Sequence, residues 1–219
     1  MHSFFSPEER AAQTLQTIGR LYEVGFKDIF LFDNSIADIG KFDIQNSFKD
    51  VKIYHRPQYT FVNKGLNEAL MILNNLHELP PGVPIFKISG RYYPSDNFRL
   101  EDYDDFQHKD FIGWGKKFDR RASWFSTVAY SVKDKSALEA TLVLTIEEML
   151  SYGRGIHGPR SLVKNIKSLF GSNIGVSYTL AVEIALANIL KAHQNFHLLD
   201  KLNVDGYLAG TTVAEFISL

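Results

Sequence analysis

The sequence predicts an α/β fold in which a mostly parallel central sheet is flanked by helices within a single domain. Short apolar runs typical of buried strands alternate with longer segments whose apolar residues recur at helical spacing. The connections between successive strands are long enough to hold a helix, as parallel pairing requires. With 219 residues, 45% of them hydrophobic, the chain can bury one large core and is short for two.

The first predicted strand is the short apolar start at residues 1–5. Ser6 supplies an N-cap and Pro7 a first-turn proline for a helix that ends at Gly25. A continuous apolar run then predicts a buried strand at residues 28–32. The expected inner face of the helix consists of Ala12, Leu15, Ile18, Leu21 and Tyr22.

The next elements continue the alternation. A short helix near residues 43–48 precedes a strand at 51–54, and a longer helix opens at Asn63 and closes before the proline-rich turn at 80–84. Residues 85–88 are expected to form the fourth strand. In the second half, the pattern predicts strands at 111–114 and 124–131, helices at 136–152 and 178–193, and a basic, glycine-rich loop at 153–160.

Composition excludes several classes of protein. The formal net charge is -1, so no global field favours binding to nucleic acid. Cysteine is absent, which excludes disulfides, thiolate chemistry and zinc sites built on cysteine. No apolar run approaches the roughly 20 residues of a membrane span, and the start does not read as a secretory signal. We therefore expect a cytoplasmic protein, and contact with a membrane surface stays open.

Polar residues follow the predicted strands at the edge where parallel sheets bind ligands. The run Asp33-Asn34-Ser35 comes after the second strand, and its carboxylate suits a ribose or a base edge. The same run forms an Asx-turn equally well. Asn63, Lys64 and Gly65 start a helix whose free N–H groups favour phosphate, although as a tripeptide they read more simply as a helix cap.

The segment Ser89-Gly90-Arg91-Tyr92 directly follows the fourth predicted strand. A glycine turn there delivers a planar guanidinium to the place where ligand phosphates would lie. The alternative is a structural ion pair of Arg91 with Asp96 or Asp33.

These runs together resemble a known family. The chain resembles nucleotide-sugar-dependent glycosyltransferases of the GT-A fold in four runs. They are Arg10-x-x-x-Thr14-Leu15-x-Thr17-Ile18, DIFLFDNS from residue 28, NKGLNEA from residue 63 and Lys87-Ile88-Ser89-Gly90-Arg91-Tyr92. Microbial and viral members with a Lys-Ile-Ser/Thr-Gly-Arg-Tyr segment are the most similar in kind. The resemblance covers residues 3–98 well. It implies a Rossmann-like sheet, a nucleotide-sugar-binding half at 1–98 and an acceptor-side half at 99–219.

The resemblance implies transfer of a sugar, with inversion, from a UDP-sugar or GDP-sugar to a hydroxyl of a surface or envelope glycan or glycolipid. Asp33 would then contact the uracil or ribose. The residues expected to bind the donor are Asp33, Asn34, Ser35, Asn63, Lys64, Lys87, Ser89, Gly90, Arg91 and Tyr92.

The chain departs from the family where many relatives have an Asp-x-Asp metal site, because Ser89-Gly90-Arg91 stands there. Two ways of neutralising the leaving diphosphate stay open. Either Arg91 does so with Lys64 or Lys87, or Asp96 holds Mn²⁺ or Mg²⁺ with one carboxylate and the diphosphate.

An inverting transfer also needs a base for the acceptor hydroxyl. We expect Glu183 or Asp119 in this role, with Glu183 favoured because it lies in an otherwise apolar helix, unless it points outward. The other candidates are Glu147, Glu148 and His157. Basic residues at 116–121 and 153–160 suit an anionic acceptor or a lid, although such runs are usually solvated surface.

Two other functions compete with this hypothesis. A nucleotidyltransferase would need a glycine-rich basic loop after the first strand, and Phe4-Phe5-Ser6-Pro7 provides none. A non-catalytic module that binds a nucleotide sugar fits the missing Asp-x-Asp. Binding without turnover would distinguish the module from an enzyme.

Overall fold

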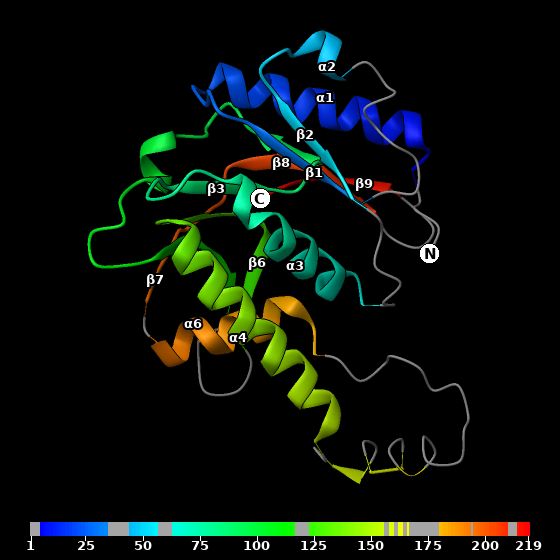
Figure 1. Ribbon diagram of the computed structural model, residues 1–219, viewed down its shortest axis with the longest axis vertical. Helices are drawn as coiled ribbons and strands as arrows, with labels where there is room; N and C mark the ends of the chain where they lie inside the picture. The colour runs from blue at the N-terminus through cyan, green and yellow to red at the C-terminus, as the bar shows by residue number, and fades with distance from the viewer. Residues whose placement is uncertain are drawn as a thin grey trace.

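The computed structural model describes residues 5–34, 44–56, 63–116, 123–155, 158–159, 162–163, 166, 180–193, 195–209 and 214–219. Figure 1 shows the arrangement of its helices and strands. In chain order the elements are α1 (Pro7–Glu23), β1 (Phe30–Asp33), α2 (Ile44–Ser47), β2 (Lys52–His55), α3 (Lys64–Asn75), η2 (Leu76–Glu78), β3 (Ile85–Ile88), β4 (Tyr92–Pro94), η3 (Leu100–Tyr103), β5 (Phe111–Lys116), β6 (Trp124–Val132), α4 (Lys135–Arg154), α6 (Val182–His193), β7 (Phe196–Leu198), β8 (Val204–Ala209) and β9 (Ala214–Ser218).

The strands form three small sheets of mixed direction. β1 and β2 pair in parallel, a second sheet has the order β3-β6-β5-β7, and a third has the order β4-β8-β9. β6 runs antiparallel to both of its neighbours, whereas β5 and β7 are parallel. The α/β prediction is confirmed, but the sheets are not mostly parallel. The connection from β5 to β6 is too short for the helical crossover that parallel pairing needs.

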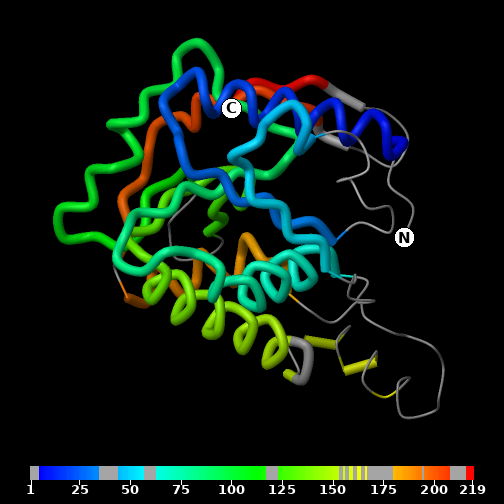
Figure 2. The backbone as a smooth tube through the Cα atoms, turned by 45° about the horizontal axis from the view of Figure 1, so that its top comes forward, coloured from blue at the N-terminus to red at the C-terminus, as the bar shows by residue number. Residues whose placement is uncertain are grey.

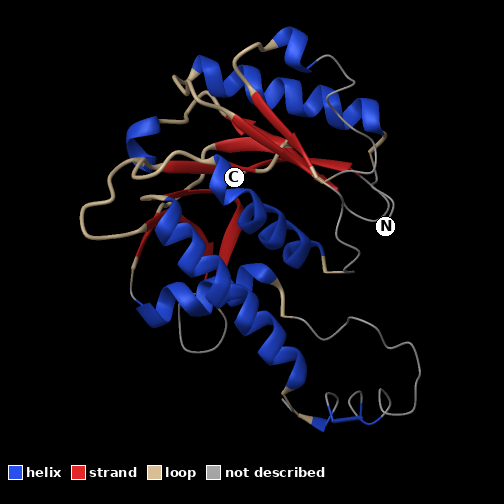
Figure 3. Cartoon of the chain, in the orientation of Figure 1, coloured by secondary structure: helices blue, strands red, loops and turns tan. Residues whose placement is uncertain are grey.

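Helices cover the strands from two sides. Figures 1 and 3 show α1 and α2 on one side of β1 and β2, and α3, α4 and α6 on the other. Strand β1 alternates accordingly, since Leu31 packs with the cluster beneath α1 while Phe30 and Phe32 pack with the cluster beneath α3, α4 and α6. Each face of β1 therefore has its own core.

Helix α1 begins and ends as predicted. Ser6 and Glu9 form a capping box at its start, and Gly25 has a positive φ of 102° just beyond its end. Ile18 and Leu21 are buried as expected, but Ala12 is exposed, and Thr14 and Thr17 are buried in its place. The inner face is rotated because α1 packs against β4, whose polar backbone accepts bonds from hydroxyl groups.

Most predicted elements are present with shifted ends. The strands at 51–54, 85–88, 111–114 and 124–131 and the helices opening at 63, 136 and 178 correspond to β2, β3, β5, β6, α3, α4 and α6. The short strands β4, β7, β8 and β9 had not been predicted. The apolar start at 1–5 lies outside the described residues except for Phe5. The loop predicted at 153–160 begins later than expected, because α4 continues to Arg154 with Gly155 as its C-cap, and residues 156, 157 and 160 lie outside the described residues. None of the helices in the described ranges has the length and apolar character needed to cross a membrane.

Candidate functional site

The carboxyl ends of β1 and β2 place an acid beside a histidine. Asp33 and His55 are register partners on the two parallel strands. His55 Nδ1 lies 2.9 Å from Asp33 Oδ2, and Asp33 is only 9% exposed. This carboxylate is therefore fixed in orientation at the sheet edge where parallel strands bind ligands. Asn34 follows it and is partly buried, while Ser35 lies outside the described residues.

The first residues of α3 are joined to the start of α6. Asn63 is the N-cap, since its Oδ1 accepts from the Leu66 backbone N–H at 3.0 Å. Its Nδ2 also donates to the Leu180 carbonyl at 3.3 Å, just before α6 begins. Gly65 faces Val182 so closely that a Cβ built on it would stand 2.3 Å from Val182 Cγ1. The predicted helix start is therefore confirmed, and its Asn and Gly have specific structural duties.

A small apolar cluster holds these helix ends together. Leu66 of α3, Met149 of α4, and Val182 and Ala185 of α6 are all buried in it. Glu183 lies next to Val182 in the first turn of α6 and is partly buried. The structure thus brings the helix turn that contains Glu183 close to the start of α3.

Strand β3 carries a lysine that is already engaged. The Lys87 ammonium forms an ion pair with Glu68 of α3 and donates to the Thr127 carbonyl and to Ser89 Oγ, the latter at 3.0 Å. It also lies 5.6 Å from the ring centre of Tyr130. Lys87 therefore ties β3 to α3 and β6, and little of its charge is left for a ligand.

Helix α1 fixes the segment after β3 through two threonines. Thr17 Oγ1 donates to the Tyr92 carbonyl at 2.9 Å, and Thr14 Oγ1 lies 3.5 Å from the Gly90 carbonyl. The space at Gly90 is tight, because an added Cβ would be 3.3 Å from Thr14 Oγ1. Tyr92 itself is buried and anchors the start of β4 in the interior.

The backbone of Arg91 is held by β8, and its side chain makes no ion pair among the residues that the structure describes. Its carbonyl accepts from the Tyr207 N–H at 3.3 Å, and Gly206 makes room for that approach. Within the described residues, neither Asp33 nor Asp96 pairs with Arg91, because His55 and Arg20 are their partners. Burial raises the pKa of Tyr92, and the nearby positive charge of Arg91 opposes that shift.

Asp96 lies apart from this edge. Its side chain is 94% exposed and sits 2.7 Å from Arg20 Nη2, a contact that raises the pKa of Arg20. Arg20 is six residues beyond Thr14, which corresponds to about 9 Å along α1. Asp96 lines a groove of about 520 Å³ with Phe98 and Asn203 among others. The described part of the chain contains no group of three His, Cys, Asp or Glu side chains suited to a metal.

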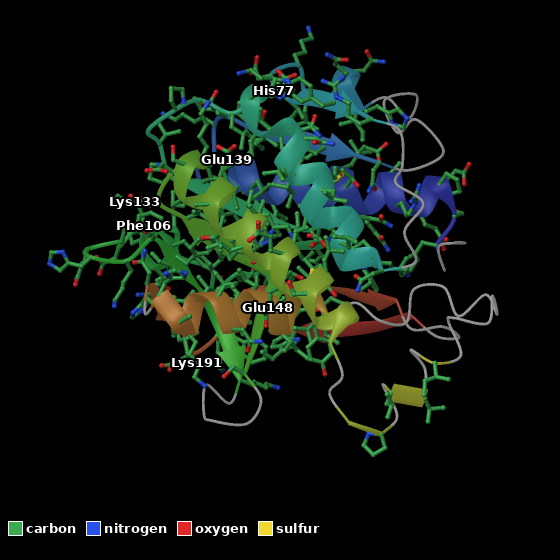
Figure 4. All side chains as sticks on the ribbon, turned by 60° about the horizontal axis from the view of Figure 1, so that its bottom comes forward. His77, Phe106, Lys133, Glu139, Glu148 and Lys191 are labelled. Carbon is green, nitrogen blue, oxygen red and sulfur yellow. The ribbon has the colours of Figure 1, made fainter. Side chains whose placement is uncertain are left out.

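Of the other candidate bases, Glu147 and Glu148 lie on α4 within the described residues. Glu147 is exposed on α4, while Glu148 accepts from Asn188 Nδ2 at 3.2 Å where α4 runs beside α6. Figure 4 labels Glu148 on α4 near α6. Asp119 and His157 lie outside the described residues.

The first turns of α1 contain two buried polar atoms with no partner among the described residues. They are Arg10 Nε and Gln13 Oε1. Arg10 precedes Thr14 by one turn, so both occupy the same face of α1. A buried donor of this kind lowers stability until a bond partner is supplied. Arg10 therefore stands one turn before the threonine that contacts Gly90.

Sequence reasoning had missed His55, Glu68 and Arg10 as members of this region. His55 was detectable, since it directly follows a predicted strand parallel to the one that ends at Asp33. Arg10 belonged to a run already recognised as informative, but its burial depends on how α1 packs. The pairing of Glu68 with Lys87 joins two separate elements and gives no local signal.

Comparisons with known proteins leave the family open: no protein-family model matches the chain, and no curated protein matches it.

Proposed function

We propose that this chain is a glycosyltransferase that moves a sugar from a nucleoside diphosphate sugar to a hydroxyl of a surface or envelope glycan. The observation that supports this most is the pair of Asp33 and His55 at the carboxyl ends of the parallel strands β1 and β2. In addition, Lys87 of β3 pairs with Glu68 of α3, and Asn63 at the start of α3 bonds to the Leu180 carbonyl just before α6. Helices on both sides of the strands and a site at the strand ends also support a GT-A-like fold.

We assign the donor's nucleoside to Asp33 and His55, which lie side by side at the carboxyl ends of β1 and β2. An oriented carboxylate accepts bonds from the two ribose hydroxyls or from a base N–H. His55 holds Asp33 Oδ2 at 2.9 Å, which fixes that acceptor before the donor arrives. A preorganised acceptor favours binding because less side-chain freedom is lost.

The diphosphate is assigned to Arg91, with Lys64 and Arg10 as further cations. Arg91 makes no ion pair within the described residues, Lys64 is exposed at the start of α3, and Arg10 Nε is buried without a partner there. A guanidinium fork matches phosphate oxygens in two bonds. Lys87 is less suited because Glu68 already neutralises it. A metal at Asp96 remains the alternative, and the experiment below separates the two.

Glu183 is the proposed base. As its carboxylate takes the proton of the acceptor hydroxyl, the acceptor oxygen bonds to the anomeric carbon. The bond from that carbon to the diphosphate oxygen breaks, and the nucleoside diphosphate leaves with the electron pair. The contact of Val182 with Gly65 supports this role because it brings the first turn of α6 close to the donor-side helix.

The first test is a thermal-shift screen of UDP, GDP, CMP, dTDP and their sugars, with and without Mn²⁺ or Mg²⁺. A ligand at about 100 times its Kd stabilises by about 2.7 kcal/mol. We expect one nucleotide to raise Tm, Arg91→Ala to abolish that rise, and Arg99→Ala, at an exposed arginine lining the Asp96 groove, to keep it. The absence of any shift would contradict donor binding. A shift that appears only with a divalent ion would favour the metal alternative.

The second test concerns turnover of the donor that binds. Glu183→Gln should keep the thermal shift and lose donor hydrolysis or transfer by at least about a hundredfold. Glu147→Gln, on the exposed face of α4, should keep both. Donor binding by the native chain with no turnover under any condition would instead support a non-catalytic nucleotide-sugar-binding module.

A further inference from the structure

His55 uses one of its two ring nitrogens in the structure. Nδ1 lies 2.9 Å from Asp33 Oδ2, and among the residues that the structure describes Nε2 has no hydrogen-bond partner. The side chain of His55 is 33% exposed, whereas that of Asp33 is 10% exposed. Asp33 therefore holds one edge of the imidazole ring, and solvent reaches the rest of the ring.

The position of His55 is set by two parallel strands. Figures 1 and 2 show β1, in blue, and β2, in cyan, running side by side to a common end. Asp33 and His55 are register partners there, and the Arg56 N–H continues the ladder by donating to the Asp33 carbonyl at 2.9 Å. Both side chains lie on the face of the strands that carries Leu31 and Ile53. The backbone therefore fixes the imidazole at the sheet edge where parallel strands bind ligands.

The bond to Asp33 decides which nitrogen of the neutral His55 ring carries the proton. A carboxylate only accepts hydrogen bonds, so Nδ1 is the donor and Nε2 keeps its lone pair. The accessible edge of the ring is thus an acceptor. Nucleobases differ in what their Watson–Crick edge presents to an acceptor. Uracil and thymine at N3, and guanine at N1, present an N–H donor, whereas cytosine at N3 and adenine at N1 present a lone pair.

We propose that His55 Nε2 accepts a hydrogen bond from the ring N–H of the donor's base, so that the site selects uracil, thymine or guanine and rejects cytosine and adenine. This inference rests on the proposed donor function and adds His55 as a residue that determines the nucleotide. Cytosine or adenine would bring two lone pairs together and leave both without a donor, which weakens binding. Asp33 then takes the ribose hydroxyls, which are the same in all ribonucleotides and select none of them.

The experiment measures the Kd of UDP, CDP, GDP and ADP for the full chain by isothermal titration calorimetry at about pH 8, where an imidazole is ordinarily neutral. UDP should bind at least about tenfold more tightly than CDP, or GDP than ADP, since each pair differs at the base edge and little in size. The N-methylated base, 3-methyl-UDP or 1-methyl-GDP, should bind no better than CDP or ADP. His55→Ala should reduce the preference to about threefold or less. His197→Ala, at an exposed histidine of β7, is the matched control and should keep the native preference.

Three outcomes would overturn this inference and leave donor binding intact. They are equal binding within both pairs of nucleotides, a preference that His55→Ala leaves unchanged, or equal binding of the methylated and unmethylated base. Failure of all four nucleotides to bind would overturn the donor assignment together with the role of His55. The comparison with the methylated base uses the native chain, so it decides the question even if His55→Ala does not fold.

Discussion

Gly65 is the point where α3 and α6 meet most closely, and replacing it with alanine should force the two helix ends apart. The added Cβ would lie 2.3 Å from Cγ1 and 2.7 Å from Cβ of Val182. Two carbon atoms at these distances repel each other strongly. The backbone of one helix must therefore shift to make room for the methyl group. Because Glu183 follows Val182, the same shift would move the proposed base.

The expected magnitude comes from two opposing effects. Overpacking a well-filled site costs about 1–3 kcal/mol. Alanine recovers part of this through its helix propensity, at most about 1 kcal/mol relative to glycine. We expect a net loss of about 1–2 kcal/mol in the free energy of unfolding, which lowers Tm by roughly 2–8 °C for a chain of this length. Val182→Ala should relieve the clash in the double variant, because the alanine methyl at 65 takes part of the vacated space.

The assay is urea denaturation of the native chain, the two single variants and the double variant. A double-mutant cycle should give a coupling energy of at least about 1 kcal/mol between Gly65 and Val182. Gly19→Ala is the control within α1, since a Cβ there would meet only Phe48 at an ordinary 3.8 Å. It should be neutral or stabilising by up to about 1 kcal/mol. Additive losses in the cycle, or equal effects at Gly19 and Gly65, would refute the close contact of α3 with α6.

Two further predictions concern stability. Asn63→Ala should lower the free energy of unfolding, measured by urea denaturation, by about 1–2 kcal/mol. The loss should exceed that of Ser6→Ala, because Asn63 both caps α3 and binds the Leu180 carbonyl. Equal losses in the two variants would argue against the bond to Leu180. Burial raises the pKa of both Tyr103 and Tyr130. The contribution of each tyrosine to the free energy of unfolding is therefore complete below the unfolded pKa of about 10 and is lost as the pH rises towards the folded pKa. The loss is about 1.4 kcal/mol per pH unit for each tyrosine. Unfolding measured between about pH 9 and 11 should show this slope reduced in Tyr103→Phe, and an unchanged slope would contradict the assignment.

Local sequence signals identified the ends of several elements correctly. The capping box at Ser6, the positive φ of Gly25 and the N-cap at Asn63 all depend on residues within a few positions of one another. Short-range hydrogen bonds and backbone sterics decide such features, so the order of residues is enough to predict them. The apolar runs that became β1 and β3 were recognisable for the same reason.

Features that depend on pairing between distant segments were not predictable in this way. The antiparallel direction of β6, the hairpin of β8 and β9, and the rotation of α1 towards its threonines follow from which surfaces pack together. Short strands give little periodic signal of their own. Their positions are therefore set by the neighbours with which they pair.

The sequence by itself determined that a carboxylate, a helix start and an arginine would follow successive strands. Tertiary structure decided which of those groups are engaged: His55 holds Asp33, Glu68 neutralises Lys87, and Arg20 takes Asp96. Each of these pairs joins residues far apart in the chain, and the strength of an ion pair depends on distance and burial, which only the fold sets. Arg91, without an ion pair in the described residues, is distinguished from Lys87 by that packing alone.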